Sequence, residues 1–156
     1  MSQSVIVGTT IRPATWEDIP LVAAIETESF SDPWSERSFG EILLAPAAIF
    51  LVAARAESRA IAGYVVALVI QNEGEILNLA VAPDFRRRGL GGELLDAGLS
   101  AVQTRGARDI FLEVRESNRP ALALYGSRGF SAIGQRRKYY RNPVEDALVL
   151  RRADER

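Results

Sequence analysis

The stretch ILNLAVAPDFRRRGLGG, residues 76–92, carries three structural signals in a row. Its first part, Ile76 to Val81, has the composition of a buried strand, and Pro83 ends that run. A helical stripe follows, and Gly106 is a natural stop for the helix. The residues of the stripe are Leu90, Leu94, Leu95, Gly98, Leu99 and Val102. The sequence therefore predicts a strand, a glycine-rich turn and a long helix in succession.

The turn from Arg86 to Gly91 has the chemistry of a phosphate site. Its glycines let a ligand approach the backbone closely, and the first N–H groups of the helix point outward. The helix dipole adds about half a positive charge there, and three arginines raise the local potential, which suits a pyrophosphate. The nucleotide-binding P-loop is excluded, because it needs Gly-Lys followed by Ser or Thr. The alternative is a solvated arginine run before a glycine-rich turn.

Strands and helices alternate on both sides of this turn. Helices are predicted from Thr15 to Phe30, from Ser35 to Pro46 and from Asn118 to Arg128. Further strands are predicted at 6–12, 49–54, 61–70, 110–114, 130–139 and 147–151. The strands at 76–81 and 110–114 flank a helix, so they should lie parallel in one sheet. The fold class is therefore α/β (α+β).

The composition is that of an ordinary folded domain, and it removes several kinds of chemistry. The 156 residues suffice for a single domain over 1–156, with short flexible ends expected at 1–4 and 152–156. Histidine and cysteine are both absent, which excludes Ser-His-Asp and Cys-His catalysis and almost every zinc, haem or iron–sulfur site. Acid–base chemistry is left to Asp, Glu, Tyr and one lysine, Lys138, and no metal is expected.

The charge of the chain limits its expected partners. The formal net charge is −1, whereas proteins that bind the nucleic-acid backbone normally carry a basic excess. No apolar stretch approaches the length of a membrane span, and the first residues lack the pattern of a signal peptide. We therefore expect a cytoplasmic protein that binds neither nucleic acid nor a membrane directly.

The whole pattern resembles the GNAT superfamily of N-acetyltransferases. Its signature, Gln/Arg-x-x-Gly-x-Gly/Ala between the fourth strand and the following helix, is matched by Arg86, Gly89 and Gly91. The resemblance implies a single-domain fold with about four helices and a mixed, mostly antiparallel sheet of six to seven strands, whose central parallel pair is splayed. It also implies acetyl-CoA as the acetyl donor, with CoA as a product. The residues implied to bind it are Leu79, Ala80, Val81, Arg86, Arg87, Arg88, Gly89, Leu90, Gly91, Gly92 and Asn118.

A narrower resemblance concerns the acceptor. The segments Phe30-x-x-Pro33-Trp34-Ser35, Leu112-Glu113-Val114-Arg115 and Tyr139-Tyr140 resemble the bacterial RimI type, the ribosomal-protein-alanine N-acetyltransferases. This implies a protein N-terminal α-amine as acceptor, namely the N-terminal alanine of a small-subunit ribosomal protein (protein eighteen). Arg119-Pro120 and Arg136-Arg137-Lys138 depart from that type and leave the peptide preference open. The alternatives are other protein N-termini, a small amine, or a non-catalytic acyl-CoA sensor.

The first candidate for proton transfer is Glu113. Alternation along the strand at 110–114 puts Glu113 and Phe111 on one face and the aliphatic residues on the other. By resemblance this glutamate is the general base, whereas the pattern alone favours a carboxylate paired with an arginine such as Arg115. A peptide α-amine has a pKa of about 7.7 to 8.0, so a modest base suffices near neutral pH.

The second candidate is Tyr125, which follows Asn118 by about two helical turns, so both can face one groove. By resemblance Tyr125 protonates the departing CoA thiolate and Asn118 hydrogen-bonds the cofactor. The alternative is a core tyrosine that anchors its helix. The resemblance also makes the backbone N–H of Val81 the group that stabilises the oxyanion. Because the chain lacks cysteine and shows no serine nucleophile motif, direct transfer in a ternary complex is expected.

The acceptor cleft is expected between two groups of aromatic residues. In the family layout Trp34 stands on one wall and Tyr139 and Tyr140 on the other, although each is equally consistent with a core position. Nearby carboxylates either attract basic residues of the acceptor or are solvated groups on a helix surface. These carboxylates are Glu26, Glu28, Asp32 and Glu36.

Overall fold

The computed structural model describes residues 8–153, and this part of the chain contains seven strands and four α-helices. The strands are β1 Thr9–Pro13, β2 Ala48–Arg55, β3 Ile61–Ile70, β4 Glu73–Val81, β5 Asp109–Arg115, β6 Ser131–Tyr140 and β7 Glu145–Arg152. The helices are α1 Ile19–Ser29, α2 Glu36–Leu44, α3 Leu90–Thr104 and α4 Arg119–Ser127. Short 3-10 turns at Trp16–Asp18 and Pro83–Phe85 precede α1 and α3.

The predicted elements are all present, with small shifts at their ends. Residues 6 and 7 of the first predicted strand lie outside the described residues, as do the predicted flexible end at 1–4 and the last three residues, 154–156, of the one predicted at 152–156. Arg152 is the last residue of β7, so the first residue of the predicted flexible end belongs to a strand. Ser35 caps α2 as predicted, because its side chain accepts a hydrogen bond from the Ser38 N–H.

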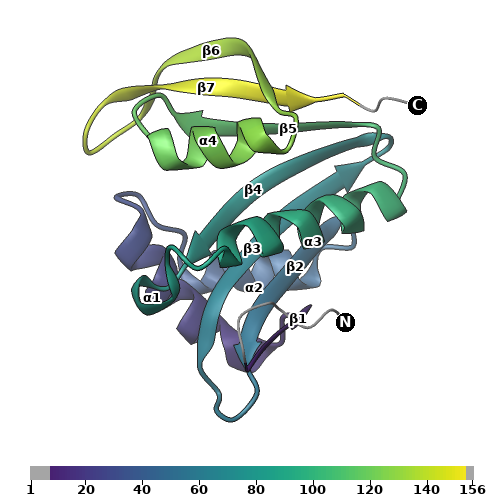
Figure 1. Cartoon of the computed structure of the whole chain (residues 1–156), viewed down its shortest axis with the longest axis vertical. Helices are drawn as coiled ribbons and strands as arrows, with labels where there is room; N and C mark the ends of the chain where they lie inside the picture. The colour runs from purple at the N-terminus through teal and green to yellow at the C-terminus, as the bar shows by residue number, and fades with distance from the viewer. Residues whose placement is uncertain (1–7, 154–156) are drawn as a thin grey trace.

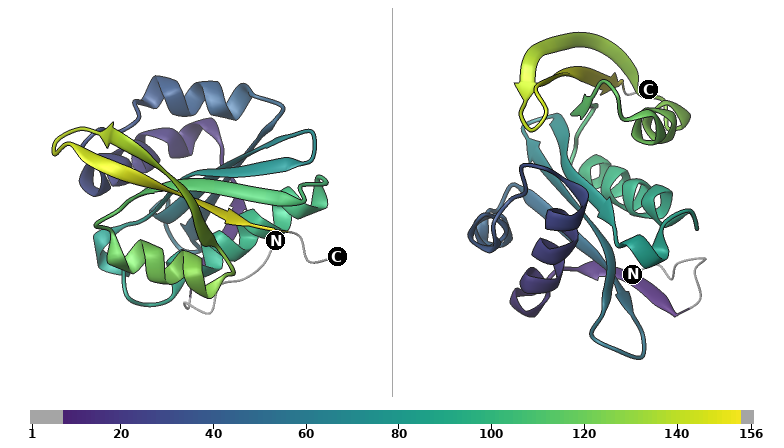
Figure 2. Two further views of the ribbon diagram at one scale, coloured as in Figure 1. Left: turned by 90° about the horizontal axis from the view of Figure 1, so that it is seen from above. Right: turned by 90° about the vertical axis from the view of Figure 1, so that its left-hand side faces the viewer.

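A single seven-stranded sheet organises the molecule (Figure 1). Its strand order is β1-β2-β3-β4-β5-β7-β6, and every neighbouring pair is antiparallel except the central β4–β5 pair. Helices α1 and α2 cover one face of the sheet and α3 and α4 the other (Figure 2). This arrangement confirms the predicted mixed, mostly antiparallel sheet with one central parallel pair. In the described residues, no helix is both long and apolar enough to cross a membrane.

Each face of the sheet has its own apolar core. On the α1–α2 face, Val22 and Phe39 pack with Tyr64 of β3, and all three side chains are fully buried. On the α3–α4 face, Leu94 and Leu95 of α3 share a larger core with residues from β1 to β5, from β7 and from α4. Burial of these side chains holds the helices to the sheet. The functional site can therefore be built on rigid elements.

The central strands β4 and β5 separate after only four paired positions. Their register runs from Glu73 opposite Asp109 to Ile76 opposite Leu112 and then stops. Figure 1 shows the two strands close together at one end and diverging toward the other. This is the splay that the family resemblance predicts.

A one-residue bulge in β4 marks the point where the strands part. Val66 of β3 stands opposite Asn78, and the next residue, Ala67, stands opposite Ile76, so Leu77 is the extra residue. Because of this extra residue, the side chains that follow it lie on the side of the sheet opposite to the one that strict alternation from Ile76 would give. Ile76 and, three residues later, Leu79 both pack into the core on the α3 side, whereas Leu77 packs into the core on the α1 side.

Candidate active site

A cleft of about 610 Å³ opens where β4 and β5 separate. Its walls come from α1, the loop before α2, β4, β5, α4 and the loop between β6 and β7. The predicted site residues that line it are Trp34, Leu79, Glu113, Asn118, Tyr125, Tyr139 and Tyr140. The structure thus brings both predicted catalytic residues and all three predicted acceptor residues to one cleft. The turn at residues 86–92 lies outside this lining, at the N-terminus of α3.

The turn forms an open helix N-terminus. Gly89 has φ +85°, a conformation that side chains rarely adopt, and it directly precedes α3. The Glu93 N–H donates to the Gly89 carbonyl, so the amides of the residues between them precede the hydrogen-bonded part of the helix. These amides are the groups that can bind phosphate oxygens.

The other residues of the first turn differ in what surrounds them. A Cβ atom on Gly91 would lie 3.8 Å from Val81 and Leu124, so this position faces the space between β4 and α4. A Cβ atom on Gly92 would lie 2.5 Å from the Arg128 guanidinium, so a side chain there would displace the end of Arg128. Leu90 is buried in the core, which leaves its backbone amide for the predicted cofactor role.

The three arginines of the turn occupy different environments. Arg86 donates to the carbonyl of Val81 at 2.9 Å and to the Ser29 hydroxyl at 3.1 Å, so it braces the turn against β4 and α1. Arg87 has φ +63° and is exposed, and the Arg88 guanidinium lies 5.6 Å from the centre of the Phe85 ring. Arg86 therefore holds the turn in place, while the charges of the other two reach solvent beside it.

Backbone groups of β4 line the gap left by the splay. The Ala82 N–H donates to the Ala62 carbonyl of β3, and the Val81 carbonyl instead accepts from Arg86. Because peptide groups alternate along a strand, those of Leu79 and Val81 point away from β3 and those of Ala80 point toward it. Of the three residues predicted to pair with the pantetheine arm, Leu79 and Val81 offer their peptide groups to the gap.

Glu113 lies where β4 and β5 separate, one residue beyond Leu112, the last residue of β5 that pairs with β4. Its carboxylate accepts a hydrogen bond from the Tyr139 hydroxyl at 3.0 Å, and its other oxygen contacts the Arg136 guanidinium. The alternative of a carboxylate paired with an arginine is therefore met, but by Arg136, whereas Arg115 pairs with Glu145. The side chain of Glu113 is 18% exposed and lines the cleft, while the oxygen that Arg136 contacts is buried against that guanidinium.

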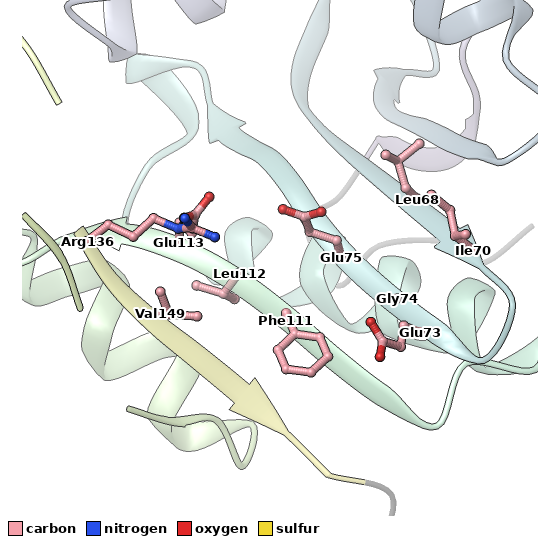
Figure 3. Close-up of a pocket in the computed structure, with 10 residues that line it drawn as sticks. All are labelled: Leu68, Ile70, Glu73, Gly74, Glu75, Phe111, Leu112, Glu113, Arg136 and Val149. Carbon is pink, nitrogen blue, oxygen red and sulfur yellow. The ribbon is translucent and has the colours of Figure 1, made fainter. Parts of the chain in front are cut away.

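Glu75 is a second carboxylate at this site, and sequence reasoning missed it. Glu75 and Glu113 line both the main cleft and a second cavity of about 270 Å³, which Figure 3 shows with both side chains on the same face of the sheet. Burial, followed by the charge of Glu113, raises the pKa of Glu75, and Arg136 opposes that shift. The strand was predicted to begin at Ile76, so Glu75 fell outside it.

Tyr125 and Asn118 mark the two ends of α4. Tyr125 is buried, its ring contacts the ring of Phe130, and burial raises the pKa of its phenol to about 12. Asn118 is the N-cap, because its side-chain oxygen accepts from the Ala121 N–H at 3.2 Å. The cofactor roles of both residues stay predictions, and each residue also stabilises the helix.

The predicted acceptor residues come from two separate segments, Trp34 from the loop before α2 and Tyr139 and Tyr140 from the end of β6. The ring of Trp34 packs against Phe39 at 5.4 Å, and the rings of Tyr139 and Tyr140 meet edge to face at 5.0 Å. Tyr139 is 49% exposed, so it is not a core residue. Burial and neighbouring charges raise the pKa of Tyr140 to about 12, and burial and Glu113 also raise the pKa of Tyr139.

Glu26 was predicted as an acidic residue near the cleft surface, but it is almost completely buried. Its carboxylate accepts hydrogen bonds from the Tyr64 hydroxyl, the Asn78 amide and the backbone N–H of Trp34. Burial and the Glu26 charge raise the pKa of Tyr64. The signal was its place on the buried stripe of α1, beside Ile25. Glu26 therefore fixes Trp34 and β4 instead of meeting the acceptor.

Comparison with known proteins gives a consistent result. Residues 19–130 match the Acetyltransferase (GNAT) family. The [ribosomal protein bS18]-alanine N-acetyltransferase of Salmonella typhimurium is 38% identical over 151 residues, covering 93% of each chain. A Bacillus subtilis protein with the same name, given there as putative, is 36% identical and covers 90% of this chain and 92% of its own.

The fold also matches a solved structure. The crystal structure of the ribosomal-protein-S18-alanine N-acetyltransferase from Escherichia coli has a TM-score of 0.84 and 32% sequence identity, covering 93% of each chain. The family match spans α1 to α4 and includes the phosphate turn, the splay and both predicted catalytic residues. The chain belongs to the GNAT acetyltransferase family and is an acetyl-CoA-dependent N-acetyltransferase.

Proposed function

We propose that the protein transfers the acetyl group of acetyl-CoA to the N-terminal alanine of a small-subunit ribosomal protein, bS18, by direct transfer in a ternary complex. The supporting observation is the near full-length similarity to enzymes named for that reaction. The cleft supports it as well, because Glu113, Tyr139 and Trp34 line one space beside the gap in the sheet. A ribosomal protein substrate makes the cytoplasm the compartment of the reaction.

The residues around the gap fit acetyl-CoA, which supplies the acetyl thioester when it is bound. The free amides of Leu90, Gly91 and Gly92 and the charges of Arg87 and Arg88 suit its pyrophosphate. The peptide groups of Leu79 and Val81 suit an extended amide-bearing arm, which would take the place of a strand beside β4. Asn118 stands at the α4 side of the same cleft.

Glu113 acts as the general base in this proposal. It takes one proton from the acceptor amine as the nitrogen forms a bond to the acetyl carbon and the carbon–sulfur bond breaks. The Tyr139 hydroxyl keeps one carboxylate oxygen in place, and the second oxygen, which Arg136 contacts, faces the amine once that guanidinium moves aside. Arg136 is 60% exposed and so has room to move.

Val81 and Tyr125 act on the oxygen and sulfur sides of the thioester. The Val81 N–H, which points into the gap, stabilises the negative charge that develops on the carbonyl oxygen. Tyr125 gives its proton to the leaving sulfur. Its raised pKa keeps the phenol protonated near neutral pH, and burial in the same groove also destabilises the thiolate, which favours the transfer.

The test is release of CoA from acetyl-CoA with a panel of acceptors. The panel contains peptides that begin with alanine and continue with basic residues, the same peptides with blocked N-termini, and small polyamines. We expect release only with free alanine termini. Release only with polyamines would keep the acetyltransferase activity and overturn the acceptor. If the protein binds CoA but releases none from acetyl-CoA with any acceptor of the panel, the result would support a non-catalytic acyl-CoA sensor.

A further inference from the structure

Arg115, at the end of β5 and two residues after Glu113, contacts both loops that form the walls of the acceptor cleft. Its guanidinium donates to the Ser31 hydroxyl at 3.0 Å, in the loop between α1 and α2. It also donates to the carbonyls of Arg141 at 2.7 Å and Pro143 at 3.0 Å, in the loop between β6 and β7. These loops are more than 100 residues apart in the chain, so one side chain joins distant segments.

The guanidinium is itself held in a defined position. It pairs with the Glu145 carboxylate at 3.1 Å and lies 4.5 Å from the centre of the Tyr140 ring. The second Glu145 oxygen accepts from the Ser117 N–H at 2.6 Å. The hydrogen bonds from Ser117 and Arg115 hold the pKa of Glu145 below its ordinary value, so the partner stays charged at neutral pH. The positive charge is thereby compensated, and the group is suited to positioning.

The two loops also contact each other directly. The Ser31 hydroxyl donates to the Arg141 carbonyl at 3.3 Å, and the Asn142 side chain donates to Asp32 at 3.1 Å. Ser31, Asp32, Asn142 and Pro143 all line the cleft that contains Glu113. The contacts thus bridge the cleft from one wall to the other, and Arg115 fixes the bridge to the strand that carries the base.

We propose that Arg115 is a positioning residue that sets the width of the acceptor cleft and thereby favours the amine of a chain terminus. A terminus can enter a cleft that is bridged on one side, because its main chain leaves in one direction only. An internal lysine brings a main chain that continues in both directions, and the bridge blocks one of them. This inference rests on the proposed function, because it takes a peptide terminus as the acceptor.

The variant that tests the bridge is Arg115→Lys. It keeps the positive charge but loses the planar set of donors that reaches Ser31, Arg141 and Pro143 together. We expect the KM for an alanine-starting peptide to rise about tenfold, as for loss of charge-assisted hydrogen bonds. The KM for acetyl-CoA should stay within about twofold, because its predicted contacts lie on other elements. Activity on an N-blocked peptide with an internal lysine should rise relative to the alanine peptide.

The matched control is Arg151→Lys, which changes the same residue type in a β7–β5 ion pair, with Asp109 at the far end of these strands. It should leave both KM values and the selectivity unchanged. Melting temperatures of both variants establish that they are folded. If Arg115→Lys does not fold, Ser31→Ala removes one exposed contact of the bridge and should produce a smaller shift of the peptide KM in the same direction.

Hydrogen exchange separates failure of this inference from failure of the proposed acceptor. In Arg115→Lys, the amides of residues 30–34 and 140–144 should exchange faster than in the wild type, whatever the acceptor is. Faster exchange with no activity on any alanine peptide would retain the bridge and reject the acceptor. Unchanged exchange together with an unchanged peptide KM would overturn the role of Arg115.

Discussion

Glu113 shows which properties of a single residue can be predicted from the sequence. Strand alternation correctly places it away from the apolar face, since its neighbours Leu112 and Val114 are buried in the core. Its ion-pair partner could not be predicted in this way. Arg136 reaches it from β6, whose pairing with β7 contains two register shifts, and such shifts leave no clear pattern in a sequence.

Replacement of this carboxylate tests the proposed base. In Glu113→Gln, turnover should fall about 10²-fold or more, because the amide cannot accept the proton. Acetyl-CoA affinity, measured by calorimetry, should change little. Asp109→Asn is the control on the same strand, because Asp109 pairs with Arg151 away from the cleft, and it should keep normal turnover. Normal turnover in Glu113→Gln would remove this residue from the role of base.

Tyr125→Phe tests the proposed acid while keeping the ring that contacts Phe130. Turnover should fall by about 10²-fold, with a small change in melting temperature. Because the pKa of this phenol is about 12, it stays protonated through the assay range, and any loss of wild-type activity between pH 8 and about pH 10 must come from another group. If the variant keeps full turnover across this range, Tyr125 serves packing alone.

At the scale of an element, the glycine-rich turn before α3 was predicted from its residue types and its phosphate-binding role stays a prediction, but the separate roles of its glycines were not predicted. Gly89 is required by its positive φ, Gly91 faces the space between β4 and α4, and Gly92 makes room for the Arg128 side chain. Arg128 is the C-cap of α4, and an ion pair with Asp96 fixes its place beside α3. That contact depends on the packing of two helices, which local sequence does not specify.

Two glycines at opposite ends of α3 make a matched pair. Gly89 and Gly106 both have positive φ, and a Cβ on either meets nothing within 4 Å. Alanine at either position should therefore lower the free energy of unfolding by about 1 to 2 kcal/mol through backbone strain. Only Gly89→Ala should also weaken acetyl-CoA binding, as measured by calorimetry. Equal acetyl-CoA affinity in the two variants would argue against the phosphate turn.

At the scale of the whole molecule, the parallel central pair follows from the sequence, because a helix between two strands gives the crossover connection that parallel strands need. The hydrogen bonds that join α1 to the sheet beside the site could not be predicted from the sequence. Glu26 joins α1 to β3, β4 and the loop at Trp34, and its partner Asn78 reaches it only because the bulge turns Asn78 toward α1. Such long-range hydrogen bonds are determined by tertiary packing.

Glu26→Gln should reveal the contribution of this network. The glutamine amide replaces one accepting oxygen with a donor and removes the charge, so either the Trp34 N–H loses its acceptor or the Tyr64 hydroxyl has to accept where it donated. The free energy of unfolding should fall by about 1 to 3 kcal/mol in urea titration. Glu28→Gln, on the exposed face of the same helix, should have no measurable effect. An equally small effect at both positions would contradict the structural role of Glu26.

The extra residue in β4 makes this site sensitive to the length of the strand as well as to its composition. A substitution at Leu77 leaves the number of residues unchanged, so the residues beyond it keep their faces. A deletion of Leu77 would place Ile76 and Asn78 at consecutive positions opposite Ala67 and Val66, so both would keep their faces, but the bend that the bulge adds where β4 and β5 part would be lost. Any alignment or design that copies this segment without the extra residue would therefore keep the faces of its side chains and lose the local backbone geometry of the gap.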